Sequence, residues 1–336
     1  MLDRSTVSSQ HTTAMGNDDD QFAISARSLT KVYRGKRGRT EKVALHGINL
    51  EVPHGAFFGL LGPNGAGKST FINILGGMTK KTAGTVTVWG HDIDRDSRRA
   101  RASIGIVPQE LHIDAHFTPF EALEFQAGFY GVPKSQRQTD AVLAALGLME
   151  QRDWYARKLS GGMQRRLLVG KALVHGPPVL VLDEPTSGVD VELRHQLWNH
   201  IRGLNQRGTT VVLTTHYLEE AEQLCDRIAI INHGKVVACD ETQTLICQID
   251  QKALTITLAH DVEAIPEGLK RFDAELGEFR QLHVRYRRSQ TQIDEILSAV
   301  HESGIEIADL TTQESNLEDL FLQLTGRGAD PESGPI

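Results

Sequence analysis

Residues 62–70 are Gly62-Pro63-Asn64-Gly65-Ala66-Gly67-Lys68-Ser69-Thr70. Gly62 and Gly67 enclose four residues and are followed by Lys-Ser, which is the pattern of a phosphate-binding loop. An apolar run at 56–61 precedes the loop and a helical run follows it at 70–75. Glycines let backbone N–H groups converge on phosphate oxygens, and the helix adds its positive N-terminus. The pattern predicts an α/β fold, with Lys68 on the β- and γ-phosphates of a nucleotide and Ser69 on Mg²⁺.

A second buried strand is predicted at 179–182, and it runs into two carboxylates, Asp183 and Glu184. Continuous apolar runs of this kind are typical of strands that are covered on both faces. A carboxylate at the end of such a strand can hold the Mg²⁺ shell, which is the role expected of Asp183. Glu184 can face the γ-phosphate and polarise the attacking water as a general base. The two motifs together predict a nucleotide-hydrolysing site.

The chain is predicted to contain four regions, with boundaries near residues 21, 247 and 326. Residues 1–21 are polar and are expected to be disordered, and Met15 offers an alternative start to Met1. Residues 22–247 alternate short apolar runs with helix-period segments, which indicates a layered α/β domain. Residues 248–326 are predicted to form a small α+β domain, and residues 327–336 a flexible tail.

Within these regions, apolar spacing predicts individual helices and strands. Helices are expected at 119–130 and 139–149, as an insertion in the α/β core, and at 191–206 with Asp190 as N-cap. In the small domain, strands are expected at 254–258 and 282–286. A helix at 291–303 and a last helix opened by a capping box, Ser315 to Glu318, complete this set.

Composition limits the possible partners. The formal net charge of −7 disfavours a protein that coats nucleic acid, so no nucleic-acid partner is expected. Cys225, Cys239 and Cys247 lack the spacing of a zinc site and are interpreted as reduced thiols of a cytosolic protein. No apolar stretch approaches the roughly 18 residues of a membrane span, and the N-terminus has no secretory pattern. A membrane role therefore requires a docking partner.

Residues 159–165, Leu-Ser-Gly-Gly-Met-Gln-Arg, resemble the signature of ATP-binding-cassette (ABC) ATPases and lie shortly before the second strand, as in that family. Ser160, Gly161 and Gly162 stand at a helix start, where amides form a second anion cradle. In the family this cradle serves the partner subunit. The resemblance implies a P-loop NTPase fold with a mixed-sheet core and a helical subdomain, and a head-to-tail homodimer that encloses ATP.

Other positions carry the same resemblance. Gln109 is similar to the glutamine that senses Mg²⁺ and the water, and Asp190 lies in a loop, 187–190, that crosses the dimer interface in the family. His216 is similar to the histidine that contacts the γ-phosphate and supports Glu184. Tyr33 is expected to stack on adenine, although a core or surface tyrosine is the alternative. Met163 and Val189 depart from the commonest family residues, as they do in exporter relatives.

Residues 214–222 and 316–321 resemble bacterial exporter ATPases of the drug-resistance and nodulation class. This implies ATP and Mg²⁺ as cofactors, a separate six-helix permease as partner, and a cytoplasmic position on the inner face of the membrane. A non-transport ABC ATPase acting on ribosomes or nucleic acid is the alternative, but that class usually has two cassettes or a long coiled coil. An inactive subunit is disfavoured because Lys68, Asp183, Glu184 and His216 are intact. The small domain is interpreted as either a sensor or dimer clamp or a stabilising appendage.

Overall fold

The computed structural model describes residues 21–35, 41–110, 112–186, 191–247, 251–260, 262, 264–277, 279–287, 290–313 and 316–326. A mixed sheet with strand order β10-β9-β3-β8-β7-β6 forms its centre, and only β10 pairs antiparallel to its neighbour. The strands are β3 (Phe57–Leu61), β6 (Ile104–Val107), β7 (Val179–Asp183), β8 (Thr210–Thr214), β9 (Arg227–Asn232) and β10 (Lys235–Glu241). The two strands predicted from apolar runs, β3 and β7, are confirmed.

Side chains of these strands alternate between two hydrophobic cores. In β3, Phe57 and Leu61 enter one core, whereas Phe58 and Leu60 enter the other. Successive side chains of a strand point to opposite faces, so a sheet covered on both sides requires an unbroken apolar run. The carboxyl ends of the parallel strands β3, β7 and β8 consequently meet at one edge, where the predicted chemistry lies.

A second sheet and two helices cover one face. Its strand order is β2-β1-β4-β5, and one core joins it to the central sheet. The elements are β1 (Phe22–Tyr33), β2 (Lys42–Pro53), β4 (Ala83–Val88), β5 (His91–Asp92), α1 (Lys68–Leu75) and α2 (Ser97–Ala102).

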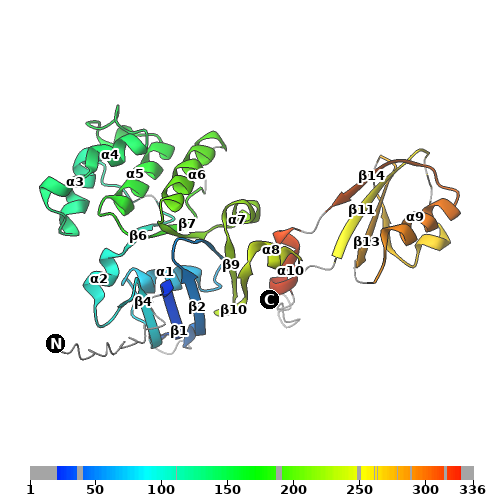
Figure 1. The fold of residues 1–336 in the computed structure, drawn as a ribbon, viewed down its shortest axis with the longest axis horizontal. Helices are drawn as coiled ribbons and strands as arrows, with labels where there is room; N and C mark the ends of the chain where they lie inside the picture. The colour runs from blue at the N-terminus through cyan, green and yellow to red at the C-terminus, as the bar shows by residue number, and fades with distance from the viewer. Residues whose placement is uncertain are drawn as a thin grey trace, which may run out of the picture.

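Helices cover the opposite face, and the first two, α3 and α4, correspond to the predicted insertion (Figure 1). They are α3 (Pro119–Phe129), α4 (Thr139–Ala145), α5 (Gly161–Leu173), α6 (Val191–Gln206), α7 (Leu218–Leu224) and α8 (Thr242–Cys247). A capping box between Thr118 and Glu121 starts α3. The helix predicted at 139–149 ends at Ala145 instead, because Gly147 adopts a left-handed φ of +63°.

The small domain (residues 251–313) has its own core between one sheet and α9 (Ile293–Glu302). Its antiparallel sheet has the order β12-β13-β11-β14. The strands are β11 (Gln251–Leu258), β12 (Asp273–Leu276), β13 (Gln281–Arg287) and β14 (Ile307–Gln313). The strands expected at 254–258 and 282–286 are confirmed as β11 and β13, while β12 and β14 were not predicted. Among the described helices, none combines the length and apolarity needed to cross a membrane.

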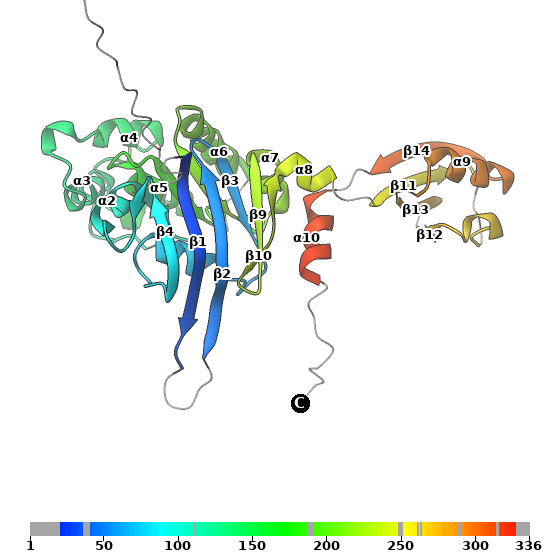
Figure 2. The ribbon, with the colours of Figure 1, turned by 60° about the horizontal axis from the view of Figure 1, so that its bottom comes forward.

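The last helix, α10 (Leu317–Gly326), corrects the predicted extent of the small domain. Figure 2 shows α10 beside α8, between the small domain and the rest of the chain. Leu317 and Leu320 belong to the core of the central sheet, and Leu317 N donates to Glu222 of α7 at 3.2 Å. The chain thus returns after residue 313, and we call residues 22–247 together with α10 the large domain.

The start of α10 also differs from the prediction. Asn316 and Asp319 exchange backbone-to-side-chain hydrogen bonds of 3.0 and 3.2 Å, so the capping pair lies one residue later than the predicted pair of Ser315 and Glu318. Ser315 lies outside the described residues.

Candidate active site

The loop at 62–70 joins β3 to α1, as the sequence predicts. Gly67 has a φ of +117°, and a Cβ there would lie 2.7 Å from Leu45 Cδ2. At Gly62 a Cβ would lie 2.2 Å from the Ile231 carbonyl oxygen. No other residue type fits these two positions, so the loop can pack this tightly only with glycine.

Lys68 is the first residue of α1, and its side chain curves back over the loop. Its ammonium donates to the carbonyl oxygens of Gly62 and Pro63, and only 8% of the residue is exposed. Burial lowers the pKa of Lys68, while the charges of Glu184 and Asp183 oppose this effect. A buried cation is therefore held at the phosphate loop, facing the acidic pair.

The acidic pair stands at the end of β7. Thr214 Oγ1 of β8 donates to Asp183 Oδ1 at 2.6 Å and accepts from Glu184 N at 3.2 Å. Glu184 has a φ of +48°, a left-handed conformation that is costly for a residue with a side chain. Strain of this kind is typical of functional sites, and here it turns Glu184 out of the strand direction.

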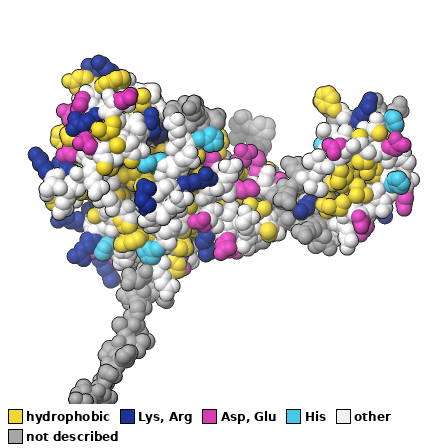
Figure 3. Space-filling view, turned by 45° about the horizontal axis from the view of Figure 1, so that its top comes forward, with side chains coloured by type: hydrophobic (Ala, Val, Ile, Leu, Met, Phe, Trp, Pro, Cys, Tyr) yellow, Lys and Arg dark blue, Asp and Glu magenta, His cyan; other side chains and the backbone are white. Residues whose placement is uncertain are grey.

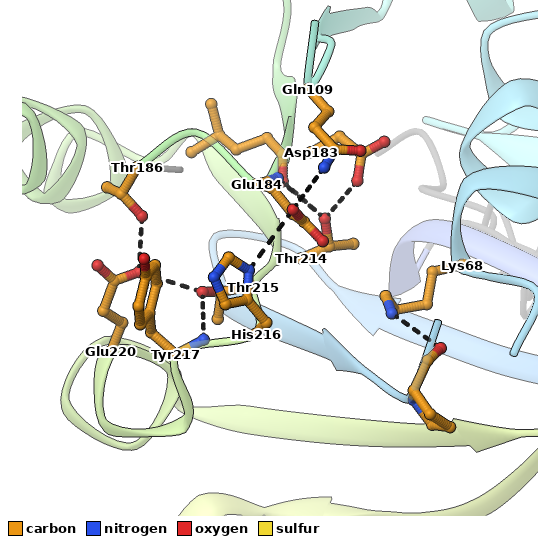
Figure 4. Close-up of polar contacts among 12 residues, drawn as sticks. Lys68, Gln109, Asp183, Glu184, Thr186, Thr214, Thr215, His216, Tyr217 and Glu220 are labelled. Atoms are coloured by element: carbon orange, nitrogen blue, oxygen red, sulfur yellow. Dashed lines mark hydrogen bonds and ion pairs between the residues drawn. The ribbon is translucent and has the colours of Figure 1, made fainter. Parts of the chain in front are cut away.

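Two predicted catalytic residues converge on an oxygen atom of the third (Figure 4). Gln109 Nε2 donates to Glu184 Oε2 at 2.7 Å, and His216 Nδ1 lies 3.5 Å from the same atom. They come from the ends of β6, β7 and β8, which are neighbours in the sheet. Gln109 and His216, which lie 75 and 32 positions from Glu184 in the sequence, thereby form one polar cluster with it.

A cavity of about 230 Å³ lies over the phosphate loop. Its wall contains the predicted residues Tyr33, Gln109 and Glu184, together with Lys42 and Ala44. The loop residues on its wall are Pro63, Asn64, Gly65, Ala66, Gly67, Lys68, Ser69 and Thr70. Sequence reasoning assigned no role to Lys42.

The signature residues lie elsewhere. Ser160 caps α5 by accepting from Met163 N at 3.3 Å, and Ser160 and Gly161 are exposed. None of Ser160, Gly161 and Gly162 contributes to the wall of the described cavity over the phosphate loop. Asp190 lies outside the described residues.

A buried arginine links the signature helix to Gln109. Arg165 Nη1 of α5 donates to the carbonyl oxygens of Pro108 and Gln109 at 3.0 and 2.9 Å, and the residue is 5% exposed. Burial lowers the pKa of this guanidinium. Sequence reasoning quoted Arg165 within the signature but assigned it no role, since nothing local predicts a partner 56 residues away.

Comparison with known proteins assigns the family. Residues 45–187 match the protein family described as ABC transporter. The chain is 36% identical to the daunorubicin/doxorubicin resistance ATP-binding protein DrrA of Streptomyces peucetius, over 94% of this chain and 96% of that one. The chain belongs to the ABC transporter ATP-binding proteins. This family membership makes the protein an ATPase, the ATP-hydrolysing subunit of a transporter.

Similarity in sequence and fold to other ABC proteins supports this assignment. Identity is 35% to the linearmycin resistance ATP-binding protein LnrL of Bacillus subtilis, covering 90% of this chain and 98% of that one. It is 37% to the Nod factor export ATP-binding protein I of Ralstonia nicotianae, with 90% and 94% covered. The dimeric, post-hydrolysis ABC cassette MJ0796 bound to ADP and phosphate shares the fold at a TM-score of 0.59 and 27% identity, over 65% of this chain and 98% of that one. The predicted ABC ATPase fold is thus confirmed.

Proposed function

We propose that this ABC ATPase binds Mg-ATP on residues 62–70 and hydrolyses it with Glu184 as the general base. The convergence of Gln109 and His216 on Glu184 Oε2, beside the cavity that Lys68 lines, carries the proposal. A carboxylate in this position can accept a proton from the attacking water. Gln109 then orients that water, and His216 supports Glu184 and contacts the γ-phosphate.

The donor set at the loop suits magnesium. Ser69 offers an exposed hydroxyl on the cavity wall, and the Thr214 hydroxyl orients the Asp183 carboxylate. Mg²⁺ prefers few protein oxygens and completes its shell with waters and phosphates. Bound magnesium would neutralise phosphate charge during transfer. We assign Ser69, Asp183 and Gln109 to this ion, and Tyr33, which lines the cavity and is 40% exposed, to adenine.

We further propose a head-to-tail homodimer in which Ser160, Gly161 and Gly162 of one copy face the ATP of the other. The exposed start of α5, outside its own chain's cavity, supports this arrangement. Backbone N–H groups and the helix dipole there favour an anion. The MJ0796 cassettes, which share the fold, were solved as dimers. Asp190 is assigned to the same interface on the family resemblance.

The named relatives act in drug resistance and Nod factor export, which favours export over a role on ribosomes or nucleic acid. We assign a separate six-helix permease as partner, so that the chain works at the cytoplasmic face of the membrane. Phe125 and Phe129 of α3 are 54% and 85% exposed and line a hollow on the helical insertion. Exposed apolar side chains that form one contiguous patch can mark an interaction site. In Figure 3 exposed hydrophobic side chains lie among charged ones over the upper left of the large domain, where the insertion lies.

A cytoplasmic segment of the permease is the proposed occupant of this hollow. Its movement would reach the site through α3 and α5, which pack together, and through Arg165, which contacts the Gln109 backbone.

Phosphate release from ATP tests the proposed function in the full-length chain, alone and with the membrane protein that co-purifies with it. Hydrolysis should require Mg²⁺, and Lys68→Ala should abolish both hydrolysis and binding of a fluorescent ATP analogue. Phe125→Ser with Phe129→Ser should retain ATP binding and lose co-purification with the permease. Normal ATP affinity in Lys68→Ala would contradict the assigned site.

A further inference from the structure

Glu220 of α7 is a buried carboxylate that the proposed mechanism does not use. It is 9% exposed and lies outside the wall of the cavity over the phosphate loop. A carboxylate taken out of water is costly unless hydrogen bonds and charges compensate it. Its partners therefore indicate what it is for.

The two oxygens of Glu220 have different partners. Oε2 accepts from Thr186 Oγ1 at 3.0 Å and from Thr215 Oγ1 at 3.2 Å (Figure 4). Oε1 faces α6, where it accepts from Trp198 Nε1 at 3.4 Å and pairs with Arg194 Nε at 3.4 Å. One oxygen thus holds loop residues, while the other is anchored to a long helix.

The two threonines are close in sequence to the proposed catalytic residues. Thr186 follows Glu184 by two positions, and Thr215 immediately precedes His216. Thr215 Oγ1 also accepts from Tyr217 N at 3.0 Å, so the backbone is tied on both sides of His216. Glu184 and His216, which lie 3.5 Å apart, are therefore carried by two segments that share Glu220 Oε2 as their anchor.

A second acidic residue of α7 has a different hydrogen-bond partner. Glu222 accepts from Leu317 N, at the start of α10, on the side of the helix that packs against the C-terminal segment. The same short helix thus presents one glutamate to the catalytic segments and one to α10. The two provide a matched pair for experiment.

We propose that Glu220 is a positioning residue that sets the relative placement of Glu184 and His216 for ATP hydrolysis. The inference rests on the proposed function, because Glu220 is assigned no contact with nucleotide and acts only through Glu184 and His216. Oε2 accepts from two hydroxyl donors, and Oε1 accepts from donors on α6. A glutamine amide has only one accepting oxygen, so it can keep one of these two sets of contacts but not both. Loss of such positioning reduces the chemical step more than substrate binding.

The test compares Glu220→Gln with Glu222→Gln in the full-length protein. Glu220→Gln should lower kcat about tenfold and leave KM for ATP within about twofold, since positioning acts on the transition state. Glu222→Gln should keep kcat within about twofold, because its hydrogen bond serves α10. Should Glu220→Gln fail to fold, Thr186→Val and Thr215→Val each remove one donor and should each lower kcat in the same way.

Combination with Glu184→Gln separates positioning from simple destabilisation. In single-turnover measurements, Glu184→Gln/Glu220→Gln should hydrolyse ATP no more slowly than Glu184→Gln alone, because the base whose placement relative to His216 depends on Glu220 is already lost. A further tenfold loss in the double variant, or wild-type kcat in folded Glu220→Gln, overturns the proposal. Wild-type hydrolysis in Glu184→Gln itself would instead overturn the proposed function, so the two failures can be told apart.

Discussion

The large and small domains both contain sheets with helices, but they differ in how the sheet is covered. The central sheet of the large domain is buried between two cores, whereas the small domain packs one core between its sheet and α9. Parallel strands buried on both faces bring their carboxyl ends to one edge, where loops from distant parts of the chain meet. The antiparallel sheet of the small domain joins its strands differently, and none of the described residues to which a catalytic role is assigned lies in it.

This difference suggests that the large domain performs the chemistry, and that the small domain contributes stability or coupling. The structure refines the division by placing α10 with the large domain.

Glu184→Gln should lower ATP turnover by about 10²–10⁴-fold, because it keeps the shape of the side chain and removes the base. ATP binding should persist, and the variant should accumulate as an ATP-bound dimer, detected by size-exclusion chromatography with ATP. Glu275→Gln in β12 of the small domain is the control and should keep wild-type turnover. Equal rates of ATP turnover in Glu184→Gln and wild type would mean that Glu184 is not the general base.

Lys68→Ala and Ser160→Arg homodimers should both be inactive, because each lesion removes one side of every shared site. Random mixing of the two should restore about a quarter of wild-type activity, since half of the dimers have one intact site of two. ATPase activity of the mixture is the measurement. Wild-type activity in a strictly monomeric preparation would contradict the shared site.

Leu317→Ala should reduce the stability of the large domain by about 2–5 kcal/mol, because it leaves a cavity in that domain's core. Trp89, Trp154 and Trp198 are the three tryptophans of the chain, so their fluorescence during urea unfolding reports on the large domain alone. Leu322→Ala on the same helix is the control, as Leu322 is 60% exposed. An unchanged tryptophan transition in Leu317→Ala would mean that α10 does not stabilise the large domain and belongs to the small one.

Arg165→Met should reduce the stability of the large domain by about 1–3 kcal/mol, because the Pro108 and Gln109 carbonyl oxygens lose their buried donor. Tryptophan fluorescence during urea unfolding measures this loss of stability. The exposed Arg157 provides the control, and Arg157→Met should change stability by less than about 0.5 kcal/mol. Equal stabilities of the two variants would make the Arg165 contacts energetically unimportant.

Replacing residues 251–313 with a short Gly/Ser linker should change ATP affinity by less than about tenfold, or 1.4 kcal/mol. The structure sharpens this experiment, because truncation after Gln248 would remove α10 as well and expose apolar surface of the large domain. The linker variant keeps α10 and tests the small domain alone. A greater loss of affinity with the large domain folded would mean that the small domain reaches the nucleotide.

The local sequence alone was enough to predict the elements that depend on the spacing of neighbouring residues. The loop at 62–70, the strands β3 and β7 and the start of α5 could be predicted because glycine positions, apolar runs and helix caps act between near neighbours. The resemblance to ABC ATPases then linked Gln109 and His216 to the same site. The end of α4 and the cap of α10 were predicted wrongly, because single turns decide where these helices end and begin.

Only the tertiary structure decided which distant groups meet. The apolar spacing of α10 predicts that one side is buried, but the return of the chain places that side on the large domain instead of the small one. In the same way, Lys42 reaches the cavity, Arg165 holds the backbone of Gln109, and Glu220 ties Thr186 to Thr215. Periodicity is a property of one segment, whereas the partner of a buried charge depends on the path of the whole chain.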